Sequence, residues 1–174
     1  LLNQSNDGDC DGSLTADDCD DANPARYPGA LGLFIDANCD GNIDTELARA
    51  DYTFVGENSD DASGRAVAIV GDVDGDGLDD LLIGAYQNDD GGTKAGKAYL
   101  VLAGSLGATS QINLSQADYS FVGEESGDKA GLSIAGAGDV DGDGLSDLVI
   151  GAPYFDDGFG KIYLVLATSL GSTS

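Results

Sequence analysis

The chain has 174 residues and a mass of 17.5 kDa, and 32 Asp and Glu against 7 Lys and Arg give it a formal net charge of -25. A chain this acidic repels phosphate backbones and anionic lipid surfaces, which argues against nucleic-acid binding and electrostatic membrane attachment. With no His, mechanisms that use an imidazole base or metal ligand are excluded. Apolar runs of about six residues are far too short for a membrane helix, which needs about 20.

Residues 1–46 are rich in Asp, Asn, Gly and Cys and poor in apolar residues, so we expect something other than a core to hold this segment. One loop in it has the spacing of an EF-hand, with Gly12 at position 6 and Asp at the last position, where Glu is usual. Its candidate ligands are Asp7, Asp9, Asp11, Ser13, Thr15 and Asp18. A second loop around Gly41 offers Asp36, Asn38, Asp40, Asn42 and Asp44.

This segment, at residues 18–21, 27–30 and 38–44, is similar to the MopE-type metal-binding repeat and more loosely to thrombospondin type 3 repeats. The resemblance implies a calcium-stapled extracellular segment; a merely acidic linker is the alternative. The family's disulfide pairing does not carry over, because the cysteine positions differ. The three cysteines suggest one disulfide, of Cys19 with Cys39 or with Cys10, and one thiol that is free or intermolecular.

The rest of the chain repeats itself. The string YTFVGE at 52–57 returns as YSFVGE at 119–124, and GDVDGDGL at 71–78 returns at 138–145. KAYLVLA at 97–103 returns as KIYLVLA at 161–167. Self-similarity of this kind is the signature of a repeat architecture. We therefore expect one repeat at 47–111 and a second at 112–174.

Each repeat is predicted to form four short strands, which in the first copy lie at 52–55, 65–70, 80–84 and 97–102. These are β-branched or aromatic runs bounded by Gly, Asp and Asn clusters. Four antiparallel strands per unit of this length describe a propeller blade. The predicted fold is all-β, with two four-stranded antiparallel blades of the β-propeller type and an irregular N-terminal segment.

Each repeat also contains a loop with Asp at positions 1, 3, 5 and 9 and Gly at position 6. Four carboxylates this close repel one another unless a cation lies among them or their pKa values rise. With a backbone carbonyl at position 7, the all-oxygen set suits Ca²⁺; Mg²⁺ and a solvated Asp-Gly turn are the alternatives. The candidate ligands are Asp72, Asp74, Asp76, Leu78 and Asp80, and Asp139, Asp141, Asp143, Leu145 and Asp147. With the N-terminal loops, we expect about four Ca²⁺ sites.

The succession of Phe-Val-Gly at 54–56, the Asp loop at 71–77 and LIGA at 82–85 resembles the FG-GAP repeat of integrin α-subunit β-propellers. The second copy, which ends in VIGAP at 149–153, is closer still. The resemblance implies that each loop joins two strands of a blade and binds calcium through its aspartates. The first copy has Tyr86 where Pro153 stands, which we expect to alter a turn and not the metal site.

Acidic pairs at 89–90 and 156–157 could in principle serve acid–base catalysis. Because both recur at a place that the repeat determines, exposed acidic turns are favoured, and we expect no enzyme. Propellers usually have about four to eight blades. Two predicted blades therefore indicate either a window of a longer propeller or a subunit that stacks head to tail into a fibre.

We favour a non-catalytic, extracellular structural protein of bacterial origin, secreted or at the cell surface, that binds calcium and self-assembles into a homo-oligomer or fibre. The alternative is an adhesion fragment of a longer integrin-like propeller with a protein or glycan ligand. Exposed aromatic loops would favour that alternative, and the candidates are Tyr86, Tyr154, Phe155 and Phe159.

Overall fold

The computed structural model describes residues 47, 50–107 and 110–171. The chain divides into two compact units, residues 1–51 and 52–174, and the strands described below belong to the second unit. The predicted metal loops at 7–18 and 36–44 and the three cysteines lie outside the described residues. Within the described part, no helix is long and apolar enough to cross a membrane.

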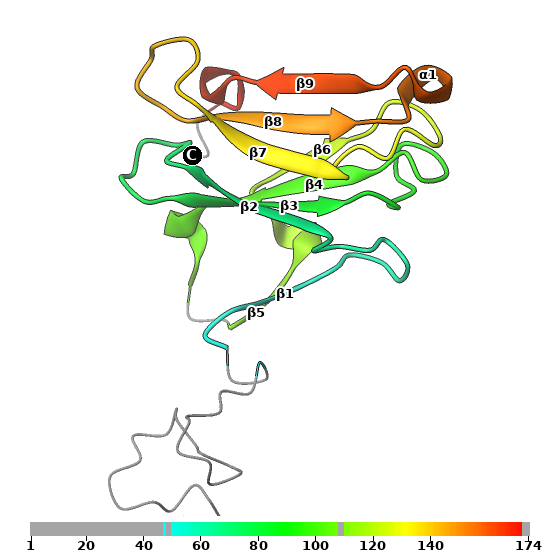
Figure 1. Cartoon of the computed structure of the whole chain (residues 1–174). Coiled ribbons are helices and arrows are strands. Elements are labelled where there is room, and N and C mark those ends of the chain that lie inside the picture. The colour runs from blue at the N-terminus through cyan, green and yellow to red at the C-terminus, as the bar shows by residue number, and fades with distance from the viewer. Residues whose placement is uncertain (1–46, 48–49, 108–109, 172–174) are drawn as a thin grey trace, which may run out of the picture. The chain divides into compact units, whose positions relative to one another are not determined.

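Short strands joined by turns make up almost all of the described chain (Figure 1). Before the YSFVGE motif at 119–124 the chain forms β1 (Thr53–Val55), β2 (Ala66–Gly71), β3 (Asp80–Ala85), β4 (Lys97–Val101), η4 (Ala103–Ser105), β5 (Gln111–Asn113) and η5 (Leu114–Gln116). From that motif onward it forms β6 (Tyr119–Val122), β7 (Ser133–Gly138), β8 (Asp147–Ala152), α1 (Phe155–Gly158), β9 (Lys161–Val165) and η6 (Ala167–Ser169). β5 crosses the boundary expected between residues 111 and 112. The predicted all-β class is confirmed.

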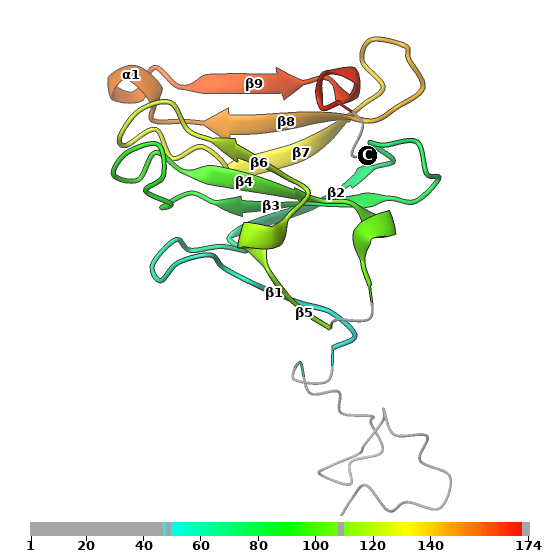
Figure 2. The same cartoon turned by 180° about the vertical axis from the view of Figure 1, so that it is seen from behind.

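The strands pair into two main sheets (Figures 1 and 2). Blade 1 is the antiparallel sheet β2-β3-β4-β6, and blade 2 is the antiparallel sheet β7-β8-β9. β1 and β5 form a separate parallel pair.

The grouping of strands differs from the sequence expectation: among the described residues blade 2 has three strands where four were predicted, and the repeats do not coincide with the sheets. β6 opens the second sequence copy, but it pairs with β4 of the first copy, with Tyr119 opposite Leu100 and Phe121 opposite Ala98. The segment after β6 then crosses to blade 2, where the Gly131 N–H donates to the Gly151 carbonyl at 3.1 Å. The first strand of the second sequence repeat, β6, therefore belongs to the blade formed by the first repeat. The boundary between blades lies one strand later than the boundary between repeats.

The two blades pack face to face over an apolar core. Leu82, Leu100 and Leu148 are fully buried in it. Glycine allows the backbones to approach: a Cβ at Gly84 would lie 2.0 Å from the Gly131 carbonyl oxygen. A second, smaller cluster covers the other face of blade 1, where Tyr99 packs with Leu114 of η5.

Candidate metal loops and the ion-pair network

The two Asp-rich loops join β2 to β3 and β7 to β8, so both lie at the same end of the blades (Figure 1). They also contact each other, because the Ser146 N–H donates to the Asp72 carbonyl at 2.8 Å. Tyr86 and Pro153, where the two copies differ, lie in turns that directly follow β3 and β8. That is the opposite end of each strand from the Asp loop.

The first loop folds around its own carboxylates. Asp72 Oδ1 accepts a hydrogen bond from the Gly75 N–H at 2.7 Å, and Oδ2 accepts one from the Gly77 N–H at 3.0 Å. Gly75 and Gly77 have φ values of 85° and 87°, a conformation that strains other residues. Carboxylate oxygens of Asp72, Asp74 and Asp80 lie within 4.8 Å of one another.

The second loop repeats this geometry. Asp139 accepts hydrogen bonds from the Gly142 N–H at 2.7 Å and the Gly144 N–H at 3.0 Å. Here the converging carboxylates are those of Asp139, Asp141 and Asp143, again within 4.8 Å of one another. Both loops thus bring three candidate ligands together, although the third member is position 9 in one loop and position 5 in the other.

The Asp at position 9 of each loop, Asp80 or Asp147, is buried. It accepts hydrogen bonds both from its own loop and from the turn that follows β4 or β9. Asp80 accepts from the Val73 N–H at 2.9 Å and from the Ala103 N–H at 2.8 Å. Asp147 accepts in the same way from Val140 at 2.8 Å and from Ala167 at 2.9 Å. Burial raises the pKa of Asp80, while the two N–H groups oppose that rise. This residue therefore has a structural role that the spacing alone did not predict.

The remaining candidates lie in the same loops. Asp76 and Asp143 accept hydrogen bonds from the Leu78 and Leu145 N–H groups at 2.7 and 2.8 Å. Carboxylate and backbone oxygens are the donors that Ca²⁺ prefers, so the residues present fit that ion. The bound calcium and the carbonyl roles of Leu78 and Leu145 stay predictions.

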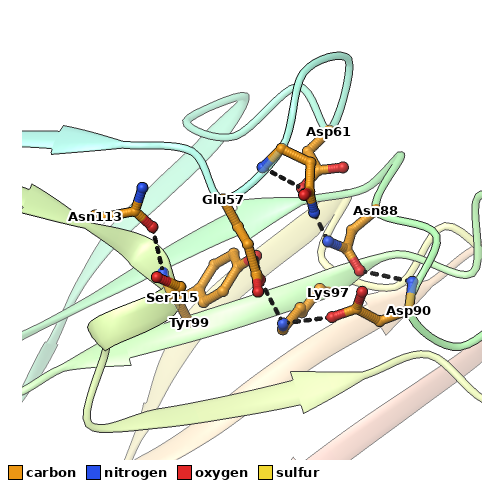
Figure 3. A network of polar contacts seen from close by, with 9 residues as sticks. Glu57, Asp61, Asn88, Asp90, Lys97, Tyr99, Asn113 and Ser115 are labelled. Atoms are coloured by element: carbon orange, nitrogen blue, oxygen red, sulfur yellow. Dashed lines mark hydrogen bonds and ion pairs between the residues drawn. The ribbon is translucent and has the colours of Figure 1, made fainter.

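A polar network that the sequence reasoning missed lies at the other end of blade 1 (Figure 3). The side chain of Lys97 is only 8% exposed, and its Nζ lies 2.6 Å from both Glu57 Oε2 and Asp90 Oδ2. The Tyr99 hydroxyl donates to the same Glu57 oxygen at 2.9 Å. Hydrogen bonds from Lys97 and Tyr99 lower the pKa of Glu57. Burial acts to lower the pKa of Lys97, but its two carboxylate partners outweigh burial and raise it.

A second group of residues extends this network. The buried carboxylate of Asp61 accepts from the Asn88 amide at 2.9 Å, and Asn88 in turn accepts from the Asp90 N–H at 3.0 Å. The acidic pair at 89–90 is exposed, as expected, yet Asp90 forms an ion pair. The available signal was the recurrence of Glu57 as Glu124 and of Lys97 as Lys161 in a chain with only 7 cations.

The second copy carries a looser version of the same pair. Lys161 Nζ lies 2.5 Å from Glu124 Oε1, but the side chains of Lys161 and Glu124 are 36% and 48% exposed. Nearby, Phe159 is 88% exposed and Tyr154 is exposed, whereas Tyr86 and Phe155 are half-buried. Two of the four aromatic candidates for ligand contact are therefore well presented to solvent.

Comparison with known proteins identifies the repeat. Residues 63–101 and 130–165 match the FG-GAP repeat, and each segment spans the three consecutive strands β2–β4 or β7–β9. These two segments are therefore similar to FG-GAP repeats, as the sequence motifs indicated.

The chain is also similar to animal integrins. It is 39% identical over 106 residues to integrin alpha-PS2 of Drosophila melanogaster, which covers 58% of this chain and 7% of the integrin. It is 35% identical over 118 residues to integrin alpha-6 of Gallus gallus (66% of this chain, 10% of the integrin). For integrin alpha-5 of Xenopus laevis the figures are 37% over 112 residues, 61% and 10%. The chain spans a tenth or less of these relatives, which give no support to a bacterial origin.

Proposed function

Because two FG-GAP repeats similar to those of integrin α chains form its described part, we propose that this chain is a non-catalytic, extracellular, calcium-stabilised β-propeller module of the adhesion type. The observation that carries the proposal is the convergence of three carboxylates in each of two equivalent loops. Such a cluster is costly without a cation, because each carboxylate disfavours the charge of the others.

The proposed ligand set uses every second residue of each loop. Its members are Asp72, Asp74, Asp76, Asp80 and the Leu78 carbonyl, and Asp139, Asp141, Asp143, Asp147 and the Leu145 carbonyl. Ca²⁺ tolerates six to eight oxygen ligands in flexible geometry, whereas Mg²⁺ demands near-octahedral geometry and retains water. A crowded set of carboxylates therefore favours Ca²⁺. The two N-terminal loops would bring the total to about four sites.

Isothermal titration calorimetry of the full chain with Ca²⁺ tests this assignment. We expect Asp72→Asn and Asp139→Asn each to lower the number of bound ions by one. Asp79→Asn is the matched control, because Asp79 is exposed and its counterpart in the second loop is Ser146. If all three variants bind as many ions as the unaltered chain, the loops are not the calcium sites.

The proposed ligand surface is the turn that carries Tyr154 and Phe159. An exposed aromatic side chain offers a large apolar contact to a protein or a glycan partner. A glycan array and a panel of matrix proteins, probed with the full chain and with Phe159→Ser, test this surface. Binding that is unchanged in the variant would place the ligand contact elsewhere.

Self-association is the second candidate function. It is supported by an apolar face on blade 2, where Ile162 is 75% and Leu164 is 50% exposed. Exposed apolar patches on a folded domain mark interaction surfaces when they are contiguous. The two side chains lie on the same face of β9, since they are two residues apart.

A further inference from the structure

The two Asp-rich loops touch each other at the joint between blade 1 and blade 2. The Ser146 N–H, at position 8 of the second loop, donates at 2.8 Å to the carbonyl of Asp72, at position 1 of the first loop. Glycines let the second loop come this close. A Cβ at Gly71 would lie 2.3 Å from Ser146 Oγ, and a Cβ at Gly75 would lie 3.3 Å from Leu145 Cδ2. The contact therefore joins the backbone of one loop directly to the backbone of the other.

The donor in this contact shares a peptide unit with a proposed calcium ligand. The Leu145 carbonyl is the proposed ligand at position 7 of the second loop, and the Ser146 N–H belongs to the same planar unit. The described part of the chain has no cis peptide bond, and in a trans unit the C=O and the N–H point in opposite directions. The N–H points to Asp72, so the Leu145 carbonyl points away from it. Whatever orients this carbonyl therefore also orients the N–H that the first loop receives.

The acceptor shares a peptide unit with a donor to another proposed ligand. The Asp72 carbonyl and the Val73 N–H form one unit, and the Val73 N–H donates to Asp80 Oδ2 at 2.9 Å. Asp80 is the proposed ligand at position 9 of the first loop, and its carboxylate converges with those of Asp72 and Asp74. Val73 and Asp80 are only 3% and 1% exposed, which protects this bond from competition by water. The two peptide units and their two hydrogen bonds, here called the relay, thus connect a proposed ligand in each loop.

An ion in one loop is expected to affect the other loop in two opposing ways. Its charge repels a second ion, but most of the acidic side chains in both loops are exposed, and salt screens exposed charges over about 8 Å. Its ligands also order the backbone of the relay, and ordering backbone costs free energy. A second ion that binds to an already ordered relay does not meet that cost again, which favours positive cooperativity. Because the relay consists of rigid units, we expect the ordering effect to exceed the repulsion.

We infer that the two loops bind Ca²⁺ cooperatively and that the relay from the Leu145–Ser146 peptide to Asp80 couples them. The inference rests on the proposed function, because it requires both loops to bind Ca²⁺. Coupling between two binding sites is reciprocal, so a filled loop of either kind raises the affinity of the other by the same factor. We expect a factor of about five, at the lower end of measured couplings.

Calcium titration of the isotope-labelled full chain, followed by NMR, tests the inference one loop at a time. The amides of Gly77 and Gly144 are the reporters, since each donates to the position-1 carboxylate of its own loop. Asp141→Asn removes a proposed ligand from the second loop and is expected to raise the calcium midpoint of Gly77 about fivefold. Asp74→Asn, in the first loop, is expected to raise the midpoint of Gly144 by the same factor.

A proline variant tests the relay itself. Ser146→Pro removes the donating N–H and leaves every proposed ligand in place. In this background, Asp141→Asn is expected to leave the Gly77 midpoint unchanged. Asp79→Pro is the matched control, because it places proline at position 8 of the first loop, outside the relay, and is expected to preserve the coupling. Asp79→Asn controls for the charge lost in Asp74→Asn, since Asp79 is exposed and is not a proposed ligand.

Hydrogen exchange supplies a readout that needs no proline variant. In Asp74→Asn, Ca²⁺ that fills the second loop is expected to slow exchange of the Val73 amide in the first loop, together with that of Ser146. A Val73 amide that does not respond would overturn the relay as the route of coupling. A Gly77 midpoint that stays the same or falls in Asp141→Asn would overturn cooperativity and leave calcium binding intact. Reporters that do not respond to Ca²⁺ at all would overturn the proposed calcium sites and this inference with them.

Discussion

Lys97 provides the sharpest test of how blade 1 is stabilised, because its two carboxylate partners can be removed one at a time. In Glu57→Gln the ammonium keeps Asp90 at 2.6 Å, and the amide oxygen can still accept from Tyr99. In Asp90→Asn the Lys97 ammonium keeps Glu57 at 2.6 Å. Each single change removes one charge-assisted hydrogen bond and is expected to cost about 1–2 kcal/mol of unfolding free energy.

The double variant Glu57→Gln/Asp90→Asn is expected to cost more than the two single changes together. It leaves an ammonium group with an 8% exposed side chain and no carboxylate partner in the network. Stranding a buried charge in this way costs about 3–5 kcal/mol. The shared Lys97 makes the two changes non-additive, as expected for residues in one network.

Urea unfolding at saturating Ca²⁺ measures these differences as changes in the midpoint at constant slope. Glu124→Gln is the matched control from the second copy. Its effect is expected to be smaller than that of Glu57→Gln, because the Glu124–Lys161 pair is exposed to solvent. A double variant that loses no more than the sum of the single losses would refute the claim that Lys97 depends on this pair of acids.

Three further predictions follow from the same geometry. The pKa of Glu57 is lowered from 4.5 by its hydrogen bond to Lys97, so its contribution is complete above pH 4.5 and is lost as the pH falls through the lower, folded value. The stability difference between the unaltered chain and Glu57→Gln should therefore shrink in acid, and chemical denaturation that showed it growing below pH 4.5 would contradict this. Gly84→Ala should lower the unfolding free energy by about 2 kcal/mol or more, because the added Cβ would meet the Gly131 carbonyl oxygen at 2.0 Å. Gly107→Ala is the control and should change the urea midpoint little, because the space around Gly107 is open. Equal midpoints for the two variants would argue against the close approach at Gly84. Each calcium loop should add about 1.4 kcal/mol at a free Ca²⁺ concentration tenfold above its dissociation constant, so melting should shift downward in EDTA, and a melting temperature unaffected by EDTA would count against both loops.

The strands and the convergence of carboxylates in the Asp-rich loops could be predicted because their signals are local, whereas metal binding at those loops stays a prediction. Val-, Ile- and Tyr-rich runs between Gly and Asp clusters mark strands wherever they occur. The Asp spacing of 72–80 brings its carboxylates together within one short loop, and the 139–147 loop repeats it. Neither prediction required knowledge of contacts between distant parts of the chain.

The strand phase and the Lys97 network could not be predicted in the same way, because both depend on contacts distant in sequence. From sequence, β6 could have paired within its own repeat or with the preceding one. The choice depends on distant contacts, because residues 123–130 hydrogen-bond to the 93–96 loop before β4 and the chain first bonds to a strand of blade 2 at Gly131. Lys97 starts a strand, where an exposed side chain is the ordinary expectation. Only its partners at 57 and 90, which lie on two other loops, explain how its charge is buried.

The one-strand offset between repeat and blade has a mechanical consequence. The chain that follows β6 is bound to both blades through adjacent residues: the Ala130 N–H donates to the Ala95 carbonyl, just before β4 of blade 1, at 2.8 Å, and the Gly131 N–H donates to the Gly151 carbonyl of β8 in blade 2 at 3.1 Å. Separating the blades would therefore require at least one of these two hydrogen bonds to break. We therefore expect both blades to unfold in one cooperative transition and to transmit strain directly from one sheet to the next.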